Sequence, residues 1–124
     1  MRKILVVDDS SVIQRIYQTY LSRYRSTQVL LAPNGAEALD TLTLEPDIDL
    51  ILLDVNMPVM NGLEFLVRLK HEPAHKDIPV IVVSTRGSEV DAQRCLDLGA
   101  QGYLKKPFGT PELYQAIEQT MGLN

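Results

Sequence analysis

Three uninterrupted runs of four apolar residues constrain the fold of this 124-residue chain more than any other feature. They cover residues 4–7, 50–53 and 80–83, and none of them alternates with polar residues. A strand that is apolar at every position is buried on both faces, which is typical of a parallel sheet covered by helices on each side. Two weaker runs of strand length, residues 28–32 and 101–105, are flanked by turn-forming residues. The sequence therefore predicts five strands.

Segments with helical spacing separate these strands. The clearest apolar stripe comprises Val12, Ile13, Ile16, Tyr17, Tyr20, Leu21 and Tyr24. Further helices are expected after Asn34-Gly35, after Asn61-Gly62, over residues 88–98 and over 110–121, the last with Thr110 as N-cap and Pro111 at the first helical position. Strict alternation of strand and helix predicts one α/β domain over residues 1–124, with a parallel sheet between two helical layers.

Composition and charge exclude several classes of protein. The chain is 45% hydrophobic and carries a formal charge of −4, which disfavours direct binding of nucleic acid. Cys95 is the single cysteine, so no internal disulfide forms, and we interpret it as a small buried hydrophobe. The apolar run after Arg2-Lys3 is too short for a signal peptide or a membrane span. We therefore expect a cytoplasmic protein with no membrane partner.

Five polar residues fall where predicted strands end. Asp8 and Asp9 follow the first strand, Asp54 the third, Ser84 the fourth and Lys106 the fifth. Ligand sites in open parallel sheets lie outside the carboxyl ends of the strands. Each residue alone has a plain structural explanation as a helix cap, a turn residue or a solvated lysine. Their coincidence at one edge of one sheet favours a functional site.

The chemistry of such a site follows from its charges. Two carboxylates about 4 Å apart repel by on the order of 4 kcal/mol at an effective dielectric of about 20, so three of them need a cation. Mg²⁺ suits a few carboxylates and leaves coordination positions for phosphate oxygens. Asp54 is then a candidate nucleophile toward phosphorus, with Lys106 offsetting the charge of the phosphoryl group and Ser84 bonding one of its oxygens.

Four sequence blocks resemble the signature of response regulator receiver domains. They read VDDS at residues 7–10, LDVNMP at 53–58 followed by Gly62, VST at 83–85 and YLKKPF at 103–108. The blocks span nearly the whole chain in the family's order. The resemblance implies a flavodoxin-like, doubly wound five-stranded sheet of order 2-1-3-4-5 with five helices. This strand order is known for the fold class in general, and the apolar pattern of the sequence does not predict it.

The resemblance also implies residue roles in a two-component phosphorelay. Asp54 is the expected phosphoacceptor, with Mg²⁺ held by the carboxylates of Asp8, Asp9 and Asp54 and the backbone carbonyl of Asn56. Ser84 is the expected switch hydroxyl and Tyr103 its aromatic partner, with Lys106 preceding a cis proline. Asn56 and Arg86 occupy positions that tune dephosphorylation, and Thr85 is bulkier than the residue usual beside the switch.

The same resemblance predicts partners. We expect a sensor histidine kinase or histidine phosphotransfer protein upstream and a protein target downstream, as in chemotaxis-type regulators. The target would bind the face of the fourth helix, fifth strand and fifth helix, with Val90, Arg94, Tyr103, Lys105 and Tyr114 as candidate contacts. Such a domain catalyses only its own phosphorylation and dephosphorylation and is not a turnover enzyme.

Several alternatives remain open. The chain is either a stand-alone regulator or the receiver portion of a longer one with an output domain. An aspartyl-phosphate phosphatase is disfavoured because those enzymes place a D-x-D pair after the first strand, and a flavin or nucleotide binder because Asp8 and Asp9 repel phosphate. Residues 71–75, HEPAH, match the H-E-x-x-H zinc pattern, but Pro73 breaks the helix that this pattern requires. We interpret this segment as a loop.

Overall fold

The fold of the computed structural model, which describes residues 2–57, 59–85 and 87–122, alternates strands and helices along the chain. The strands are β1 (Arg2–Val7), β2 (Thr27–Ala32), β3 (Leu50–Asp54), β4 (Val80–Ser84) and β5 (Gly102–Lys105). The helices are α1 (Ser11–Leu21), α2 (Gly35–Leu44), α3 (Gly62–His71), α4 (Glu89–Asp97) and α5 (Thr110–Met121). The elements expected from the apolar runs and helical stripes are therefore confirmed, with ends that shift by a few residues.

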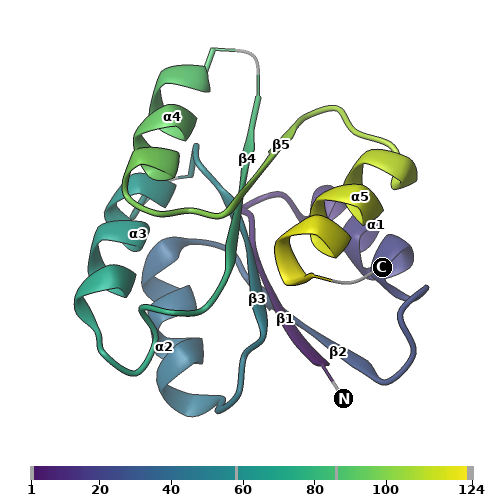
Figure 1. Ribbon diagram of the computed structural model, residues 1–124, viewed down its shortest axis with the longest axis horizontal. Helices are drawn as coiled ribbons and strands as arrows, with labels where there is room; N and C mark the ends of the chain where they lie inside the picture. Colours follow the sequence, from purple (N-terminus) through teal and green to yellow (C-terminus); the bar gives the residue numbers. More distant parts are fainter. Residues whose placement is uncertain (1, 58, 86, 123–124) are drawn as a thin grey trace.

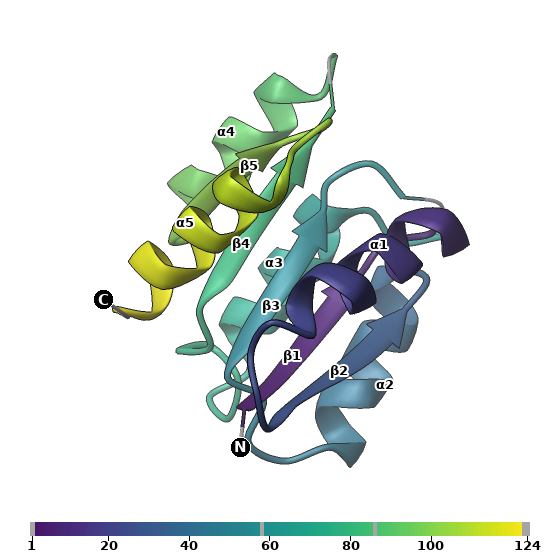
Figure 2. The same ribbon diagram turned by 90° about the vertical axis from the view of Figure 1, so that its right-hand side faces the viewer.

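The five strands form one parallel sheet between two helical layers. Their order is β2-β1-β3-β4-β5, as the receiver resemblance predicted. Helices α2, α3 and α4 cover one face and α1 and α5 cover the other (Figure 1). Turned by 90°, the molecule shows α1 and α5 in front of the sheet (Figure 2). All the strands point the same way, so their carboxyl ends line one edge.

Burial on both faces explains the unbroken apolar runs. Successive side chains of a strand point to opposite faces, so neighbours along β1 join different cores. Leu5 and Val7 pack under α2, α3 and α4, whereas Ile4 and Val6 pack under α1 and α5. The same alternation runs through β3 and β4, whose residues are all buried. A polar residue inside these runs would lie in one of the two cores.

Side-chain caps define the starts of α2 and α3. The side-chain oxygens of Asn34 and Asn61 accept hydrogen bonds from the backbone N–H groups of Glu37 and Glu64, at 3.0 and 2.9 Å. Each cap lies immediately before a glycine, and the Asn-Gly pairs in the sequence therefore mark these helix starts correctly. Among the described residues, none of the helices has the length and apolar character needed to cross a bilayer.

Two helix ends differ from the expectation. The N-cap of α5 is Gly109, not Thr110, because Gly109 keeps an extended backbone while Thr110 is already helical. The Glu112 carboxylate accepts the hydrogen bond from the Gly109 N–H at 2.8 Å, a task that needs no side chain on the cap residue. Helix α1 ends at Leu21, so Tyr24 continues the apolar stripe outside the helix and packs against Tyr114 instead.

Candidate acidic site at the carboxyl edge

Parallel pairing brings the predicted site residues to one edge of the sheet. Val7 of β1 pairs with Leu53 of β3, so Asp8 and Asp54, the next residue of each chain segment, lie side by side. Asp54 in turn pairs with Val83, which precedes Ser84. Ser84 pairs with Lys105, the residue before Lys106. Residues far apart in sequence therefore meet because the strands are in register.

Three carboxylates form the centre of the site. Asp8, Asp9 and Asp54 each offer an oxygen, and these oxygens lie within 4.8 Å of one another. Asp8 and Asp54 are buried, and Asp9 is exposed. Oxygens that share one Mg²⁺ at about 2.1 Å lie roughly 3 to 4.2 Å apart in an octahedral shell. The spacing and the all-oxygen donor set therefore fit a hard divalent cation.

Lys106 bridges two of these carboxylates. Its Nζ lies 2.7 Å from Oδ2 of Asp8 and 3.4 Å from Oδ2 of Asp54. Desolvation would lower the pKa of Lys106, but the hydrogen bond to Asp8 and the charges of Asp54 and Asp8 outweigh it and raise this pKa above its usual range. The ammonium is therefore charged at neutral pH and partly balances the acidic cluster.

Asp54 lies in a less favourable environment for a charge. Burial raises the pKa of its carboxyl, the Lys106 charge opposes this change, and the Asp8 charge adds to it. The Asn56 N–H donates to Oδ1 of Asp54 at 3.2 Å, which orients the carboxylate. A desolvated carboxylate held by few donors keeps its oxygens available as nucleophiles.

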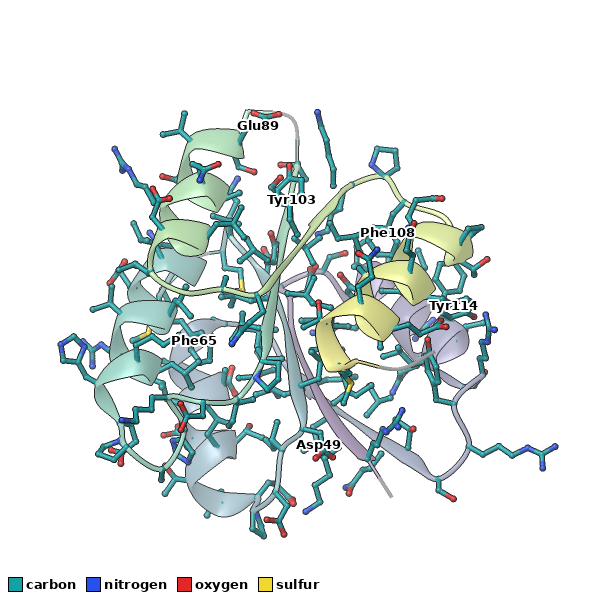
Figure 3. The ribbon with its side chains drawn as sticks, in the orientation of Figure 1. Asp49, Phe65, Glu89, Tyr103, Phe108 and Tyr114 are labelled. Atoms are coloured by element: carbon teal, nitrogen blue, oxygen red, sulfur yellow. The ribbon has the colours of Figure 1, made fainter. Side chains whose placement is uncertain are left out.

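Ser84 and Tyr103 form a hydroxyl pair beside this cluster. The Ser84 side chain is fully buried, and its Oγ lies 2.8 Å from the Tyr103 hydroxyl oxygen. Tyr103, labelled in Figure 3, is 40% exposed, so it spans from the buried serine to the protein surface. The two residues that the sequence paired as switch hydroxyl and aromatic partner are therefore in direct contact.

The segment between β4 and α4 is organised by Ser88. Its hydroxyl donates to the Thr85 carbonyl and accepts from the Thr85 N–H, both at 2.9 Å. Thr85 is partly exposed beside the switch serine. Arg86, a predicted tuning residue, lies outside the described residues. A salt bridge of 3.6 Å between Glu89 and Lys105 ties the start of α4 to β5.

The structure adds site neighbours that the sequence had not singled out. The Gln14 side-chain amide donates to the Asp8 carbonyl at 2.7 Å. Tyr17 is buried with its ring 5.6 Å from that of Phe108, two residues after Lys106. Burial, followed by the charges of Asp8 and Asp54, raises the Tyr17 pKa, so its phenol stays neutral. Apolar spacing had marked Tyr17 as core, and no sequence pattern marks Gln14.

An apolar hollow of about 480 Å³ borders the site on the α1 side. It is lined by Ile13, Ile16, Tyr20, Thr85, Lys106, Pro107 and Phe108. Lys106, Thr85 and Tyr20 are the lining residues with polar side-chain groups, and Lys106 also contacts the acidic cluster. Lys106 therefore lies between the hollow and two of the carboxylates, Asp8 and Asp54. The peptide bond between Lys106 and Pro107 is cis, as the receiver resemblance predicted.

The two histidines of the H-E-x-x-H pattern lie apart from this site. His71 is the last residue of α3, and His75 lies in the turn after it. They do not share one helix face, as the zinc pattern would require. The loop interpretation is confirmed for residues 72–75, whereas His71 is still helical. Within the described residues, the three aspartates are the only group of three or more potential metal-ligating side chains close enough to share one ion.

A doubly wound α/β fold with a lysine-bridged acidic cluster at its carboxyl edge defines a class of signalling domains, and comparisons with known proteins agree. The family model "Response regulator receiver domain" matches residues 4–118. A chemotaxis protein CheY homolog of Campylobacter jejuni is 39% identical over 120 residues, covering 97% of this chain and 92% of that protein. The chain belongs to the response regulator receiver domain family. It is a receiver domain of two-component signalling, of the chemotaxis type.

Solved structures agree with this assignment. The Vibrio cholerae chemotaxis protein CheY4 is 33% identical and superimposes with a TM-score of 0.86, covering 97% of this chain and 98% of that one. The receiver domain of the sensor histidine kinase PA1611 from Pseudomonas aeruginosa is 26% identical, with a TM-score of 0.85 over 98% of both chains. That structure contains a magnesium ion coordinated in the active-site cleft.

Proposed function

We propose that Asp54 is the phosphoacceptor of this receiver domain. The observation that carries the proposal is the position of Lys106, whose ammonium contacts both Asp8 and Asp54 inside the cluster of three carboxylates. Such a cation beside a desolvated carboxylate suits a site that must receive a phosphoryl group with several negative charges. A receiver fold with a cluster of this composition supports phosphorylation better than any other reaction.

In the proposed reaction an Asp54 carboxylate oxygen attacks phosphorus. A new P–O bond forms, and the bond from phosphorus to the donor, P–N in a phosphohistidine or P–O in an acyl phosphate, breaks. The leaving group keeps the electron pair of that bond. Mg²⁺, when bound, supplies positive charge to the transferring phosphoryl oxygens. The carboxylates of Asp8, Asp9 and Asp54 with the Asn56 carbonyl would hold it. The Pseudomonas receiver domain, which has the same fold, contains a magnesium ion in its active-site cleft.

Lys106 and Ser84 are proposed to bind the phosphoryl group. Lys106 would exchange its contact with Asp54 for a phosphoryl oxygen while keeping Asp8 in reach. Ser84 would donate its hydroxyl proton to another oxygen while accepting a hydrogen bond from Tyr103. Phosphorylation is thereby linked to the surface through Tyr103. Asn56 and Arg86 are proposed to set how fast the phosphoryl group is lost.

The proposed partners follow from the two sides of the site. A histidine kinase or phosphotransfer protein would deliver the phosphoryl group, and the apolar hollow beside Lys106 offers it a surface. The downstream protein would bind the α4, β5 and α5 face, where Val90 and the Arg94 and Lys105 side chains are exposed. Tyr114 is less available, because its hydroxyl donates to the Tyr20 carbonyl at 2.8 Å.

We further propose that residues 1–124 form one receiver domain, that this domain works in the cytoplasm, and that it has no turnover activity of its own. It would catalyse only its own phosphorylation and dephosphorylation. The similarity over 120 residues to a chemotaxis protein CheY homolog supports a receiver role for these residues.

Incubation with acetyl phosphate and Mg²⁺, followed by intact mass measurement, tests the proposal. The wild type should gain the mass of one phosphoryl group, and Asp54→Asn should gain none. Asp40→Asn, an exposed aspartate on α2, is the matched control and should behave as wild type. Equal modification of wild type and Asp54→Asn, or no modification of either, would refute it.

A further inference from the structure

Asp9 differs from the other two carboxylates of the site in having no side-chain support. The Asp8 carboxylate accepts hydrogen bonds from the Ser10 N–H at 2.9 Å and from Lys106. The Asp54 carboxylate accepts from the Asn56 N–H and from Lys106. Asp9 is exposed, and over residues 2–57, 59–85 and 87–122 its carboxylate makes no hydrogen bond or salt bridge. Where this carboxylate can reach therefore depends on where the backbone places the Asp9 Cα and Cβ atoms.

The backbone of Asp9 is held from one side by Gln14. The Asp8 carbonyl belongs to the peptide unit that joins Asp8 to Asp9, so its direction fixes the plane in which the Asp9 nitrogen lies. Within the described part of the chain, the hydrogen bond of 2.7 Å from Gln14 Nε2 is the only one that this carbonyl accepts. The hydrogen bond from Gln14 therefore restrains the backbone from which the Asp9 side chain extends.

Helix geometry explains how Gln14 reaches this carbonyl. Gln14 is the fourth residue of α1, and helical side chains lean toward the N-terminus of their helix. The start of α1 lies directly after Asp9, with Ser10 as N-cap. The Gln14 amide is long enough to extend back past the cap to the end of β1. A shorter side chain at this position would not cover that distance.

We propose that Gln14 is a positioning residue of the metal site. By holding the Asp8 carbonyl, it fixes the peptide unit before Asp9 and so keeps the Asp9 side chain within reach of the other two carboxylates. This inference rests on the proposed function, since it concerns the same cation site. The other bonds of Asp8 do not replace Gln14. The Asp8 N–H bond to the Ala32 carbonyl holds the preceding peptide unit, and the Ser10 N–H holds the Asp8 side chain.

The consequence is a loss of cation affinity that is separate from the chemistry. Without Gln14 the Asp9 carboxylate must be ordered by the ion itself, which weakens binding. None of the described hydrogen bonds of Asp54 and Lys106 involves Gln14. The phosphorylation rate at saturating Mg²⁺ should therefore change little. Residues that hydrogen-bond to metal ligands without binding the metal commonly contribute about tenfold or more to the metal affinity.

The experiment compares Gln14→Met with Gln18→Met. Methionine matches the length of glutamine but donates no hydrogen bond, and Gln18 is an exposed residue one turn further along α1. Mg²⁺ dissociation constants are measured by calorimetric titration of the full chain. We expect a constant raised about tenfold for Gln14→Met and one within twofold of wild type for Gln18→Met. The rate with acetyl phosphate at saturating Mg²⁺ should stay within about twofold of wild type.

Each other outcome overturns the inference. An unchanged dissociation constant in Gln14→Met, with or without a lower melting temperature, would reduce Gln14 to a structural role. An unchanged constant with a lower saturating rate would do the same. If Gln14→Met does not fold, Gln14→Asn, which keeps the amide but is too short, is titrated with the same criteria. If the wild type does not bind Mg²⁺, the proposed function fails together with this inference. If the wild type and Gln14→Met bind Mg²⁺ with equal dissociation constants, this inference alone fails.

Discussion

Lys106 Nζ lies 2.7 Å from Oδ2 of Asp8, although 98 positions of sequence separate the two residues. The contact joins the end of β5 to the end of β1 and places a cation inside an acidic cluster. The same ammonium lies 3.4 Å from Asp54. Lys106 is therefore an internal counter-charge of the site, and in the proposed phosphorylated form it would bind the phosphoryl group.

Lys106→Met should destabilise the protein when no divalent cation is present. It leaves Asp8 and Asp54 buried without their counter-charge, and breaking a buried ion pair by removing one partner costs about 3 kcal/mol. Millimolar Mg²⁺ should recover part of that loss, because the ion replaces the missing charge. Urea denaturation with and without Mg²⁺ measures both effects. Lys105→Met, which removes an exposed pair, is the control, and an equal loss in the two variants would contradict this account.

Asp54→Asn should stabilise the ion-free protein at pH 7. Burial raises the pKa of Asp54 on folding, so its favourable contribution is present below the unfolded pKa of about 4 and is lost as pH rises through the folded value. At neutral pH the ionised carboxylate therefore opposes folding, and the neutral amide does not. Melting temperatures in EDTA should be higher for the variant at pH 7, with the difference shrinking toward pH 4. A lower melting temperature of Asp54→Asn than of wild type at pH 7 would show that the ionised Asp54 carboxylate stabilises the fold, contrary to this prediction.

Tyr103→Phe should cost about 1 kcal/mol of stability, because Ser84 is fully buried and loses its hydroxyl partner. The rate of phosphorylation by acetyl phosphate should remain close to wild type, since Tyr103 does not contact the carboxylates. Tyr114→Phe removes another hydroxyl with a bond of 2.8 Å, remote from Ser84, and is the matched control. If phosphorylation slows tenfold in Tyr103→Phe alone, the hydroxyl pair acts on the chemistry rather than on the switch.

Gly62→Ala should destabilise the protein by about 3 kcal/mol. An added Cβ would lie 2.6 Å from the Asp54 carbonyl oxygen and 2.8 Å from the Val55 Cα, which are backbone atoms that cannot move aside. The strain would act on the backbone of Asp54, the proposed phosphoacceptor. At Gly109 the nearest atom to an added Cβ is the end of the Glu112 side chain, at 3.0 Å, so Gly109→Ala should cost less. Denaturation midpoints of the two variants give the comparison.

Cys95 should resist alkylation in the folded protein. Its side chain is fully buried, and burial, followed by the Asp91 charge, raises the pKa of the thiol to about 11. Iodoacetamide at pH 8 should label it slowly under native conditions and rapidly in denaturant. Equally fast labelling in both would show that α4 opens readily, which would contradict the close packing of this helix.

Apolar periodicity predicted the elements well because burial imposes it. Residues 4–7, 50–53 and 80–83 lie in central strands and must be apolar on both faces, so their runs indicated parallel strands before any contact was known. Helix ends were less certain. Thr110 has a typical capping side chain, yet Gly109 is the cap, because backbone conformation decides where a helix starts. The receiver resemblance supplied the strand order, which the pattern alone left open.

The sequence by itself determined which residues reach the site, because Asp8, Asp9, Asp54, Ser84 and Lys106 follow or end strands whose carboxyl ends share one edge. Only the tertiary structure decided how they meet there. Lys106 lies closer to Asp8 than to Asp54, and Gln14 turns back from α1 to hold the Asp8 carbonyl. These contacts depend on strand register and on the direction in which side chains leave a helix. Both are set by packing across the whole domain and leave no pattern in neighbouring residues.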